Sequence, residues 1–468
     1  MSRPDAHHVT IYAPATPPGA AAVAVLRLSG PESRAILSSL TGRNDFVPRR
    51  ASLVTIRDPA SGETLDRALA VLFPGPESYT GEDSVELHLH GGRAVMADVL
   101  DCLASLASLA SLASLAGEGR ALRPAEPGEF TRRAFLAGKM DLTEAEGIAD
   151  LVAAETSAQR RQALGQAGGA LGRLYESWRS RLIRILAHAE AMIDFPEEDL
   201  PESITDEAIP KIQEVMAEIT QHLADARRGE ILRDGVHVVI LGPPNAGKST
   251  LLNKLAAREA AIVAARAGTT RDVIEVRLDV AGVPVILADT AGLRETGDEI
   301  ESEGVRRAVA RAAEADLRLV VVDATEPGAG AAAIERWGGE DPMVLVNKID
   351  LLATTAPVPE TLGGHRCLAL SLGTGAGLGP ALAALAGRVR SLAGDGRDTV
   401  LTRARHRSAL EEVRQGLARA ADRLGAGGGL DLAAEDLRLA ARSLGRITGR
   451  VDVDELLDVV FGEFCIGK

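Results

Sequence analysis

The chain has 468 residues, 46% of them hydrophobic and only 3% aromatic, and its formal net charge is −14. This length predicts about two to four domains, whose cores must be built from aliphatic side chains. The acidic balance excludes a uniformly basic nucleic-acid coat, so a nucleic-acid site would have to be a local patch. Three widely separated cysteines exclude a disulfide framework. We expect a cytoplasmic protein without a membrane segment, because the sequence holds no targeting pattern and no long apolar run.

The first predicted domain spans residues 1–142. Short apolar runs at 22–28, 68–73 and 84–90 alternate there with turns rich in proline and glycine, which predicts a small α+β domain. A Leu-Ala-Ser repeat at 103–116 consists of good helix formers, but its leucines recur every third residue and therefore spiral around a helix. We interpret the repeat as an expanded helix turn or loop of little function.

A discontinuous helical domain is predicted for residues 143–234 and 397–468. Apolar residues recur there at helical spacing, although glycines at 165–172 argue against one unbroken helix in the first part. Between the two parts, residues 235–396 alternate apolar strand patterns with helices, beginning with VHVVIL at 236–241. The economical interpretation is a helical domain interrupted by an inserted α/β module, in a multidomain α/β protein.

The inserted module carries GPPNAGKST at 242–250, between a predicted strand and a predicted helix. In such a loop the glycines let backbone N–H groups wrap phosphates. Lys248 would neutralise phosphate oxygens, and the Ser249 hydroxyl would ligate Mg²⁺. The context of strand, loop and helix makes this a strong prediction of a nucleotide site.

Two motifs further along predict contacts around the γ-phosphate. Thr270 in GTTRD offers a second hydroxyl to Mg²⁺, while DTAG supplies Asp289 to the metal through water and the Gly292 amide to the phosphate. Leu293 follows DTAG and cannot orient water as a glutamine does, which leaves two alternatives. One is a monovalent cation near Asn245. The other is a downstream carboxylate, and the eligible ones are Glu295, Asp298, Glu299, Glu301 and Glu303.

The motif NKID at 347–350 predicts guanine rather than adenine as the base. Asp350 can accept hydrogen bonds from the guanine N1–H and the exocyclic amine, and a buried carboxylate would reject a base that leaves it unpaired. A weaker motif, SLGTG at 371–375, is expected to contact the base through its backbone, although Leu372 stands where many such proteins have alanine.

Five motifs outside the nucleotide site resemble those of a known family. They are TPPG (16–19), LRLSG (26–30), FPGPESYTGEDSVELHLHGG (73–92), RPAEPGEFTRRAFLAGKMDLTEAEGIADL (123–151) and FCIGK (464–468). With them the chain resembles, nearly end to end, the bacterial tRNA modification GTPases called MnmE or TrmE. The resemblance implies an N-terminal folate-binding and dimerisation domain, a discontinuous α-helical domain and an inserted Ras-like P-loop GTPase domain.

The resemblance also implies a function. Members of this family add a carboxymethylaminomethyl or aminomethyl group at C5 of the wobble uridine, position 34, of certain tRNAs. The one-carbon unit comes from a tetrahydrofolate derivative, and GTP hydrolysis depends on Mg²⁺ and K⁺. The implied assembly is a homodimer joined by the flavoprotein MnmG (GidA), which carries FAD, in a heterotetramer-like complex. The alternative is a ribosome-assembly GTPase that shares the nucleotide motifs, and the folate-domain motifs and the terminal CIGK argue against it.

Site residues follow from the motifs and the resemblance together. The resemblance places the folate derivative at Arg27, Glu86, Lys139 and Lys468, and it selects Glu301 as the catalytic residue. The implied K⁺ ligands are Asn245, Ala264, Arg266 and Thr269, with Mg²⁺ at Ser249 and Thr270. The predicted nucleotide-binding residues are Asn245, Ala246, Gly247, Lys248, Ser249, Thr250, Ala264, Ala265, Arg266, Ala267, Gly268, Thr269, Thr270, Asp289, Thr290, Ala291, Gly292, Asn347, Lys348, Asp350 and Ser371. Cys465 is a candidate functional thiol, with a packed tail cysteine as the equal alternative.

Some residues depart from the family pattern, and others are candidates for tRNA contact. Ala20, Ala21 and Ala22 replace the glycines that usually follow TPPG, and Ala264 stands where some relatives have threonine.

The arginines of the helical regions that could form a basic patch are Arg160, Arg161, Arg173, Arg179, Arg181, Arg184, Arg438, Arg442, Arg446 and Arg450. An ordinary solvated helix face is the competing interpretation of both runs.

Overall fold

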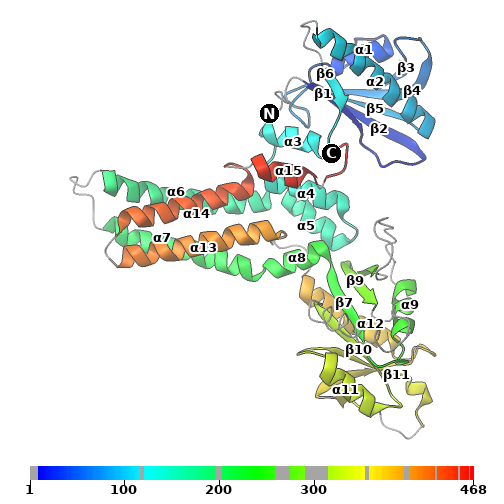
Figure 1. The fold of residues 1–468 in the computed structure, drawn as a ribbon, viewed down its shortest axis with the longest axis vertical. Helices are drawn as coiled ribbons and strands as arrows, with labels where there is room; N and C mark the ends of the chain where they lie inside the picture. The colour runs from blue at the N-terminus through cyan, green and yellow to red at the C-terminus, as the bar shows by residue number, and fades with distance from the viewer. Residues whose placement is uncertain are drawn as a thin grey trace. The chain divides into compact units, whose positions relative to one another are not determined.

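The computed structural model describes residues 9–115, 121–194, 203–258, 275–289, 315–353, 358–394, 401–426, 429–451, 454–462 and 464–468. Contacts divide the chain into two compact units, one of Met1–Ala149 with Thr448–Lys468 and one of Asp150–Ile447 (Figure 1). Compact units defined by packing need not coincide with sequence domains, so the predicted boundaries after residues 142, 234 and 396 stay predictions.

In its described part, the first unit contains a six-stranded sheet with the order β3-β4-β5-β2-β1-β6. The paired strands are antiparallel, except that β1 and β6 are parallel. The elements of this unit are β1 (Val9–Pro14), β2 (Ala21–Ser29), α1 (Ser33–Thr41), β3 (Ser52–Arg57), β4 (Thr64–Phe73), β5 (Ser84–Gly91), α2 (Arg93–Leu115), β6 (Ala121–Pro124), α3 (Glu129–Leu136), α4 (Leu142–Ala153), whose last residues belong to the second unit, and α15 (Asp454–Gly462).

Helices α1 and α2 pack on one face of this sheet. Because side chains alternate along a strand, Leu26 and Leu28 of β2 point to the same face, and they share a core with Leu37 of α1 and Leu103 of α2. Leu103 begins the Leu-Ala-Ser repeat, so the repeat forms helix α2 up to Leu115. Arg27 lies between the two leucines and therefore points to the other face of the sheet.

The C-terminal segment packs within the first unit. Phe461 and Phe464 share a small core with Leu142 at the start of α4. Gly128 has a φ of 66°, and a Cβ there would come within 2.6 Å of the Phe461 carbonyl oxygen, so glycine is needed at this approach. At Gly467 a Cβ would come within 2.0 Å of the carbonyl oxygen of Pro14 in β1. The terminal residues thus lie against β1.

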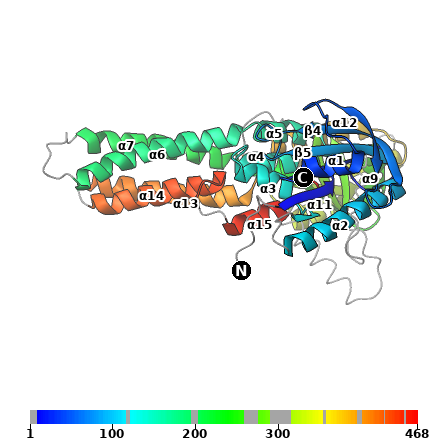
Figure 2. The same cartoon turned by 90° about the horizontal axis from the view of Figure 1, so that it is seen from above.

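The helical part of the second unit is built from both sides of the inserted module. Its helices are α5 (Ser157–Ala167), α6 (Ala170–Asp194), α7 (Ser203–Ala224), α8 (Ala226–Asp234), α13 (Ala404–Gly425) and α14 (Leu430–Thr448). Helices α6, α7, α13 and α14 lie side by side along most of their length (Figure 1 and Figure 2), around one core that includes Trp178, Ile212, Leu410 and Leu437. The predicted discontinuous helical domain is confirmed. The predicted break falls between α5 and α6, whereas Gly165 and Gly172 lie within helices.

The inserted module contains, in its described part, a seven-stranded sheet with the order β12-β13-β11-β10-β7-β9-β8. The two edge pairs, β8 with β9 and β12 with β13, are antiparallel, and the other described pairs are parallel. The elements of the module are β7 (Val236–Leu241), α9 (Lys248–Arg258), β8 (Glu275–Val280), β9 (Val283–Asp289), β10 (Leu317–Asp323), α11 (Pro327–Trp337), β11 (Met343–Asn347), η2 (Ile349–Leu351), β12 (Thr361–Leu362), β13 (His365–Ala369) and α12 (Leu378–Ala393). The strands predicted from apolar runs are therefore confirmed.

Among the described helices, none is both long enough and apolar enough to cross a membrane.

Candidate functional site

The glycine-rich loop lies where β7 ends and α9 begins. Gly242 has a φ of 143° and Gly247 a φ of 108°, a backbone region that favours glycine. A Cβ at Gly242 would lie 2.0 Å from the Val321 carbonyl oxygen of β10, so this glycine lets the loop leave the sheet. Asn245, at the exposed tip, also has a positive φ of 59°. The loop is a tight turn with its amides at the N-terminus of a helix, the arrangement that binds phosphate.

Lys248 and Ser249 open helix α9 directly after this turn. The Lys248 ammonium donates to the carbonyl oxygens of Gly242 at 3.0 Å and Pro243 at 2.7 Å, so it spans the loop where phosphate oxygens would lie. Ser249 is exposed at the first turn of the helix, as a hydroxyl ligand of Mg²⁺ requires. Among the described side chains, no group of three or more His, Cys, Asp or Glu could hold a metal by itself.

Asn347 joins the three loops of the nucleotide site. Its side-chain amide donates to the Ala246 carbonyl oxygen at 2.8 Å, and its Oδ1 accepts from the Leu372 N–H at 2.9 Å. The residue is only 3% exposed, and Ser371 beside it is fully buried. Asn347 thereby fixes the glycine-rich loop, the end of β11 and the SLGTG loop relative to one another. This structural role for the first residue of NKID was not predicted from the sequence.

The two charged residues of NKID differ in exposure, since Lys348 is half-buried and Asp350 is exposed. The Lys348 ammonium donates to Asp323 at 2.6 Å, and Lys348 has a φ of 65°. Burial alone would raise the pKa of Asp323, but hydrogen bonds from Lys348 and Thr325 outweigh it and lower that pKa. Asp350 is exposed in the structure, so the expectation of a buried carboxylate is wrong for the protein by itself. A Cβ at Gly373 would lie 4.0 Å from Asp350 Oδ2, which places the carboxylate beside the SLGTG loop.

Several predicted residues lie outside the described part of the chain. Strand β9 ends at Asp289, which is in register with Ile240 of β7 and so lies next to the strand that leads into the glycine-rich loop. The predicted residues outside the described ranges are Ala264, Ala265, Arg266, Ala267, Gly268, Thr269, Thr270, Thr290, Ala291, Gly292 and Glu301, together with Leu293 and the other carboxylates up to Glu303.

In the first unit, Arg27 lies between aromatic and acidic side chains. Its guanidinium donates to Glu86 at 2.9 Å, across the paired strands β2 and β5. The rings of Tyr79 and Phe130 each lie 5.6 Å from the guanidinium carbon. We call Arg27, Tyr79 and Phe130 the Arg27 cage. Burial raises the pKa of Tyr79, and its hydroxyl also shares a hydrogen bond of 2.9 Å with Thr131.

The C-terminal lysine approaches the same guanidinium. Gly467 lies against Pro14 of β1, which is in register with Leu26, the neighbour of Arg27 on β2. Burial and, next, the positive charge of Arg27 lower the pKa of Lys468. Lys139 is exposed, and its Cε lies 3.8 Å from the position of a Cβ at Gly81. Cys465 is an exposed free thiol near this tail lysine. Cys102, by contrast, is a buried thiol, and burial raises its pKa to about 11. Three predicted folate residues, Arg27, Glu86 and Lys468, are thus brought together.

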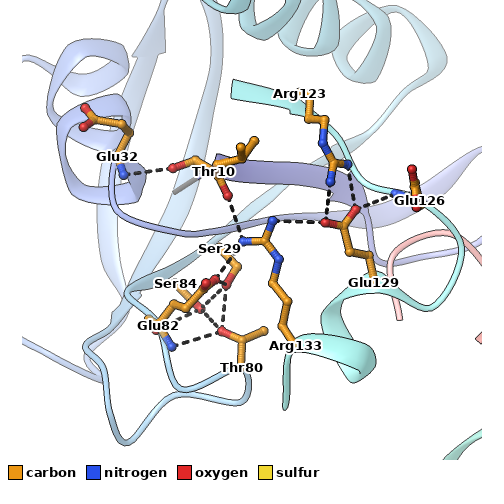
Figure 3. Close-up of polar contacts among 11 residues, drawn as sticks. Thr10, Ser29, Glu32, Thr80, Glu82, Ser84, Arg123, Glu126, Glu129 and Arg133 are labelled. Atoms are coloured by element: carbon orange, nitrogen blue, oxygen red, sulfur yellow. Dashed lines mark hydrogen bonds and ion pairs between the residues drawn. The ribbon is translucent and has the colours of Figure 1, made fainter. Parts of the chain in front are cut away.

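A buried ion network beside the cage was not predicted. We call its members, Ser29, Thr80, Glu82, Arg123, Glu129 and Arg133, the Arg133 network (Figure 3). Arg133 is 2% exposed and donates to Glu82 at 2.9 Å, to Glu129 at 3.0 Å and to the Val9 carbonyl oxygen at 2.8 Å. Arg123 donates to Glu129 through both terminal guanidinium nitrogens, each at 2.7 Å. The partners are far apart in sequence, so no local pattern announces them.

The arginine-rich helices are partly neutralised across the bundle. Arg181 of α6 pairs with Glu214 at 2.9 Å and Glu218 at 2.7 Å, both on α7. Arg438 of α14 pairs with Glu190 of α6 at 2.7 Å. A count of charges along a single helix does not include these acidic partners on neighbouring helices. The described arginine runs therefore carry less unpaired positive charge than the sequence indicates.

Together, the parallel sheet, the glycine-rich loop after β7 and the Asn-Lys-x-Asp motif after β11 define a P-loop protein that binds guanine nucleotides. Comparison with known families then identifies the family within this class. Residues 142–465 match the MnmE helical domain, and residues 10–139 match the GTP-binding protein TrmE N-terminus. The chain belongs to the MnmE (TrmE) family, and it is a GTP-hydrolysing enzyme.

Similar proteins cover almost the whole chain. A tRNA modification GTPase MnmE of Parvibaculum lavamentivorans is 57% identical, over 98% of this chain and 100% of that protein. The MnmE of Paramagnetospirillum magneticum is 55% identical over 98% and 99% of the two chains. A mitochondrial 5-taurinomethyluridine-tRNA synthase subunit of Danio rerio, GTPB3, is 48% identical over 98% of this chain and 93% of its own length.

Solved structures resemble only part of the chain. The G domain of the T. maritima FeoB iron transporter is 24% identical and covers 34% of this chain, with a TM-score of 0.26. Aquifex aeolicus Era covers 38% at 24% identity, with a TM-score of 0.27. Likenesses this weak add nothing to the family assignment.

Proposed function

We propose that this protein uses a GTP cycle to gate modification of the wobble uridine of certain tRNAs. It would add a carboxymethylaminomethyl or aminomethyl group at C5 of uridine 34, with a one-carbon unit from a tetrahydrofolate derivative. The observation that carries the proposal is the convergence of Arg27, Glu86 and Lys468 in the unit that matches the TrmE N-terminus, in the same chain as a GTP site. The names of the similar proteins, which modify tRNA, support it.

The chemistry of a reduced folate suits these side chains. Its glutamyl carboxylates can pair with the ammonium groups of Lys139 and Lys468, and its pterin N–H groups can donate to a carboxylate such as Glu86. Glu86 also pairs with Arg27, so the cage presents a fixed carboxylate next to a fixed guanidinium. The carboxylate of such a pair can accept hydrogen bonds from the ligand while the guanidinium donates to it. An isolated surface charge cannot do both.

For GTP hydrolysis, the proposed roles follow the phosphate chain. Lys248 and the loop amides hold the phosphates, and Ser249 with Thr270 would hold Mg²⁺, which neutralises phosphate charge. Asn245, Ala264, Arg266 and Thr269 would hold K⁺, in the place of an arginine finger. Glu301 would orient the attacking water. Exchanging sodium for potassium should raise hydrolysis steeply, and equal rates in both salts would remove the cation from the proposal.

The proposed partners follow the family. We propose a cytoplasmic homodimer that works with the FAD-carrying flavoprotein MnmG, in a heterotetramer-like complex, on tRNA. In this scheme the flavoprotein supplies the redox chemistry, and the GTP-dependent state of this chain determines when the modification proceeds. The predicted sequence domains, 1–142, 143–234 with 397–468, and 235–396, would then correspond to folate binding, coupling and GTP hydrolysis.

The direct test is binding of 5-formyl-tetrahydrofolate to the full chain. The full chain is required because Lys468 lies in the C-terminal tail. Wild-type protein should bind, and Arg27→Ala should weaken binding by about tenfold or more, because a charged hydrogen-bonding group is lost. Arg34→Ala is the matched control, since Arg34 pairs with Asp83 at an exposed position. A wild-type chain that fails to bind would contradict the proposal and favour the ribosome-assembly alternative.

A further inference from the structure

The Arg133 network meets the Arg27 cage at three places. Each residue of the cage has a network residue next to it, or two positions away, in the sequence. The three pairs are Phe130 with Glu129, Tyr79 with Thr80, and Arg27 with Ser29. The other network residues, Glu82, Arg123 and Arg133, lie farther from the cage in sequence, and the three pairs come from α3, from the loop before β5 and from β2.

The network and the Tyr79–Thr131 hydrogen bond both attach the loop at 74–83 to its surroundings. Glu82 accepts from Arg133 at 2.9 Å and from the Ser29 hydroxyl at 2.9 Å. Thr80 shares hydrogen bonds of 2.7 Å with Ser29 and 3.2 Å with Ser84, all of them buried groups. Figure 3 shows Arg133 reaching from α3 to this loop. The loop carries Tyr79, so the ring on one side of Arg27 is held through the network.

The charges of the network are balanced only when its members are together. Burial raises the pKa of Glu129, but hydrogen bonds from Arg123 and the Glu126 N–H, with the charge of Arg133, lower it overall. A buried guanidinium that loses all its acidic partners is strongly destabilising, whereas one that loses a single partner out of two keeps a neutral pair. Arg133 has such partners on both sides, Glu82 in the loop and Glu129 in its own helix.

We infer that Arg133 and Glu82 are positioning residues that hold Tyr79 and Arg27 in place for the ligand of the N-terminal site. The inference rests on the proposed function, in which that ligand is a reduced folate. In this inference neither residue touches the ligand, and Arg133 is only 2% exposed. Their ion pair joins the Tyr79 loop to α3, which carries Phe130, so together with the Tyr79–Thr131 hydrogen bond it sets the spacing between the two rings that flank the Arg27 guanidinium.

The testing variant is Glu82→Gln, which removes the charge of Glu82 while Arg133 keeps its pair with Glu129. Arg34→Ala is the control, because it removes an exposed ion pair to the neighbouring residue Asp83. If Glu82→Gln does not fold, Thr80→Val takes its place, since it removes the buried hydroxyl contacts at nearly constant volume.

The first measurement is independent of folate. Tyr79 is 37% exposed, while the other two tyrosines, Tyr12 and Tyr175, are buried, so nitration by tetranitromethane should report on Tyr79. We expect the Tyr79 nitration rate, followed by peptide mass spectrometry, to rise severalfold in Glu82→Gln and to stay unchanged in Arg34→Ala. An unchanged rate in a folded Glu82→Gln protein overturns the inference, because a purely structural ion pair would alter melting without loosening Tyr79.

The second measurement is the dissociation constant for 5-formyl-tetrahydrofolate. We expect Glu82→Gln to weaken binding by about tenfold, because displaced site residues lose affinity without losing a contact group. Equal affinity in wild type and Glu82→Gln overturns the inference. If wild type itself does not bind, the proposed function fails, and the nitration result alone then decides whether the network positions Tyr79.

Discussion

At the residue scale, the nucleotide site depends on close approaches that only glycine permits. Gly247 is the clearest case, since its φ is 108° and a Cβ would lie 2.3 Å from Asn347 Nδ2. Asn347 is the side chain that joins the glycine-rich loop to the SLGTG loop. A methyl group at residue 247 would therefore disturb the phosphate and base subsites together.

We predict that Gly247→Ala lowers the affinity for a fluorescent guanine nucleotide by about 10²-fold, because strain and a displaced Asn347 add to each other. Gly387→Ala is the matched control, because Gly387 lies in α12 with nothing near its Cβ position. Alanine there should raise stability slightly, by at most about 1 kcal/mol, and leave nucleotide affinity unchanged. Unaltered affinity in Gly247→Ala would contradict this account of the site.

A second residue-scale feature is His222, a buried histidine of the helical core. Burial, and next the charge of His406, lower the pKa of His222 from 6.5 to about 4, while Asp225 acts weakly the other way. Its ring packs edge-on against Tyr175 and Trp178. Between pH 4 and 6.5 the unfolded chain binds more protons at this residue than the folded one. Stability therefore falls as pH decreases through that window.

From pH 7 to pH 5, the His222 contribution should cost about 2 kcal/mol of unfolding free energy. Urea denaturation at several pH values measures it. His222→Gln should make the unfolding free energy depend less on pH in this range. His188→Gln, at an exposed position of α6, should keep the pH dependence of the wild type. A wild-type slope in His222→Gln would show that another group is responsible.

At the element scale, the connections into and out of the inserted module meet at one carboxylate. Asp150 accepts from Arg233, near the end of α8, at 3.2 Å and from Arg403, just before α13, at 2.9 Å. The side-chain amide of Gln159 in α5 also donates to the Arg233 carbonyl oxygen at 2.9 Å. Helices that are separated in sequence by the whole module are thus tied together at its root.

Asp150→Ala should destabilise the second unit by about 3 kcal/mol, because it leaves two arginines without their shared buried partner. Asp341→Ala is the control, since Asp341 is 72% exposed where it pairs with Arg388. That change should cost about 0.5 kcal/mol or less. Thermal unfolding of both variants provides the measurement, and equal melting temperatures would mean that Asp150 does not hold the connections.

Sequence patterns predict the secondary-structure elements but not the contacts between segments that are distant in sequence. The strands of the inserted module and the interrupted helical domain follow from apolar periodicity, because burial imposes a local repeat. The glycine-rich loop was predictable because its motif demands a particular backbone. The pairing of Arg181 with Glu214 and Glu218, and the network around Arg133, depend on segments brought together by the tertiary fold. No periodicity within one helix encodes such partners.

At the scale of the whole molecule, GTP binding and GTP hydrolysis should be separable. Glu301→Ala is expected to retain nucleotide affinity and to lose about 10²-fold or more in kcat, because the residue would orient water rather than hold phosphate. Glu303→Ala, two residues away, is the matched control and should keep its activity. Phosphate release under single-turnover conditions measures the step, and full activity in Glu301→Ala would reject the assignment.

We propose that the GTP site of the inserted module and the folate site of the first unit act together to modify tRNA. Nucleoside mass spectrometry of tRNA from a strain lacking this protein tests it most directly. We expect the C5 group of the wobble uridine to disappear in this strain and to return with the wild-type chain, but not with Lys248→Ala, which weakens phosphate binding. Wobble uridines that remain fully modified without the protein would contradict the claim.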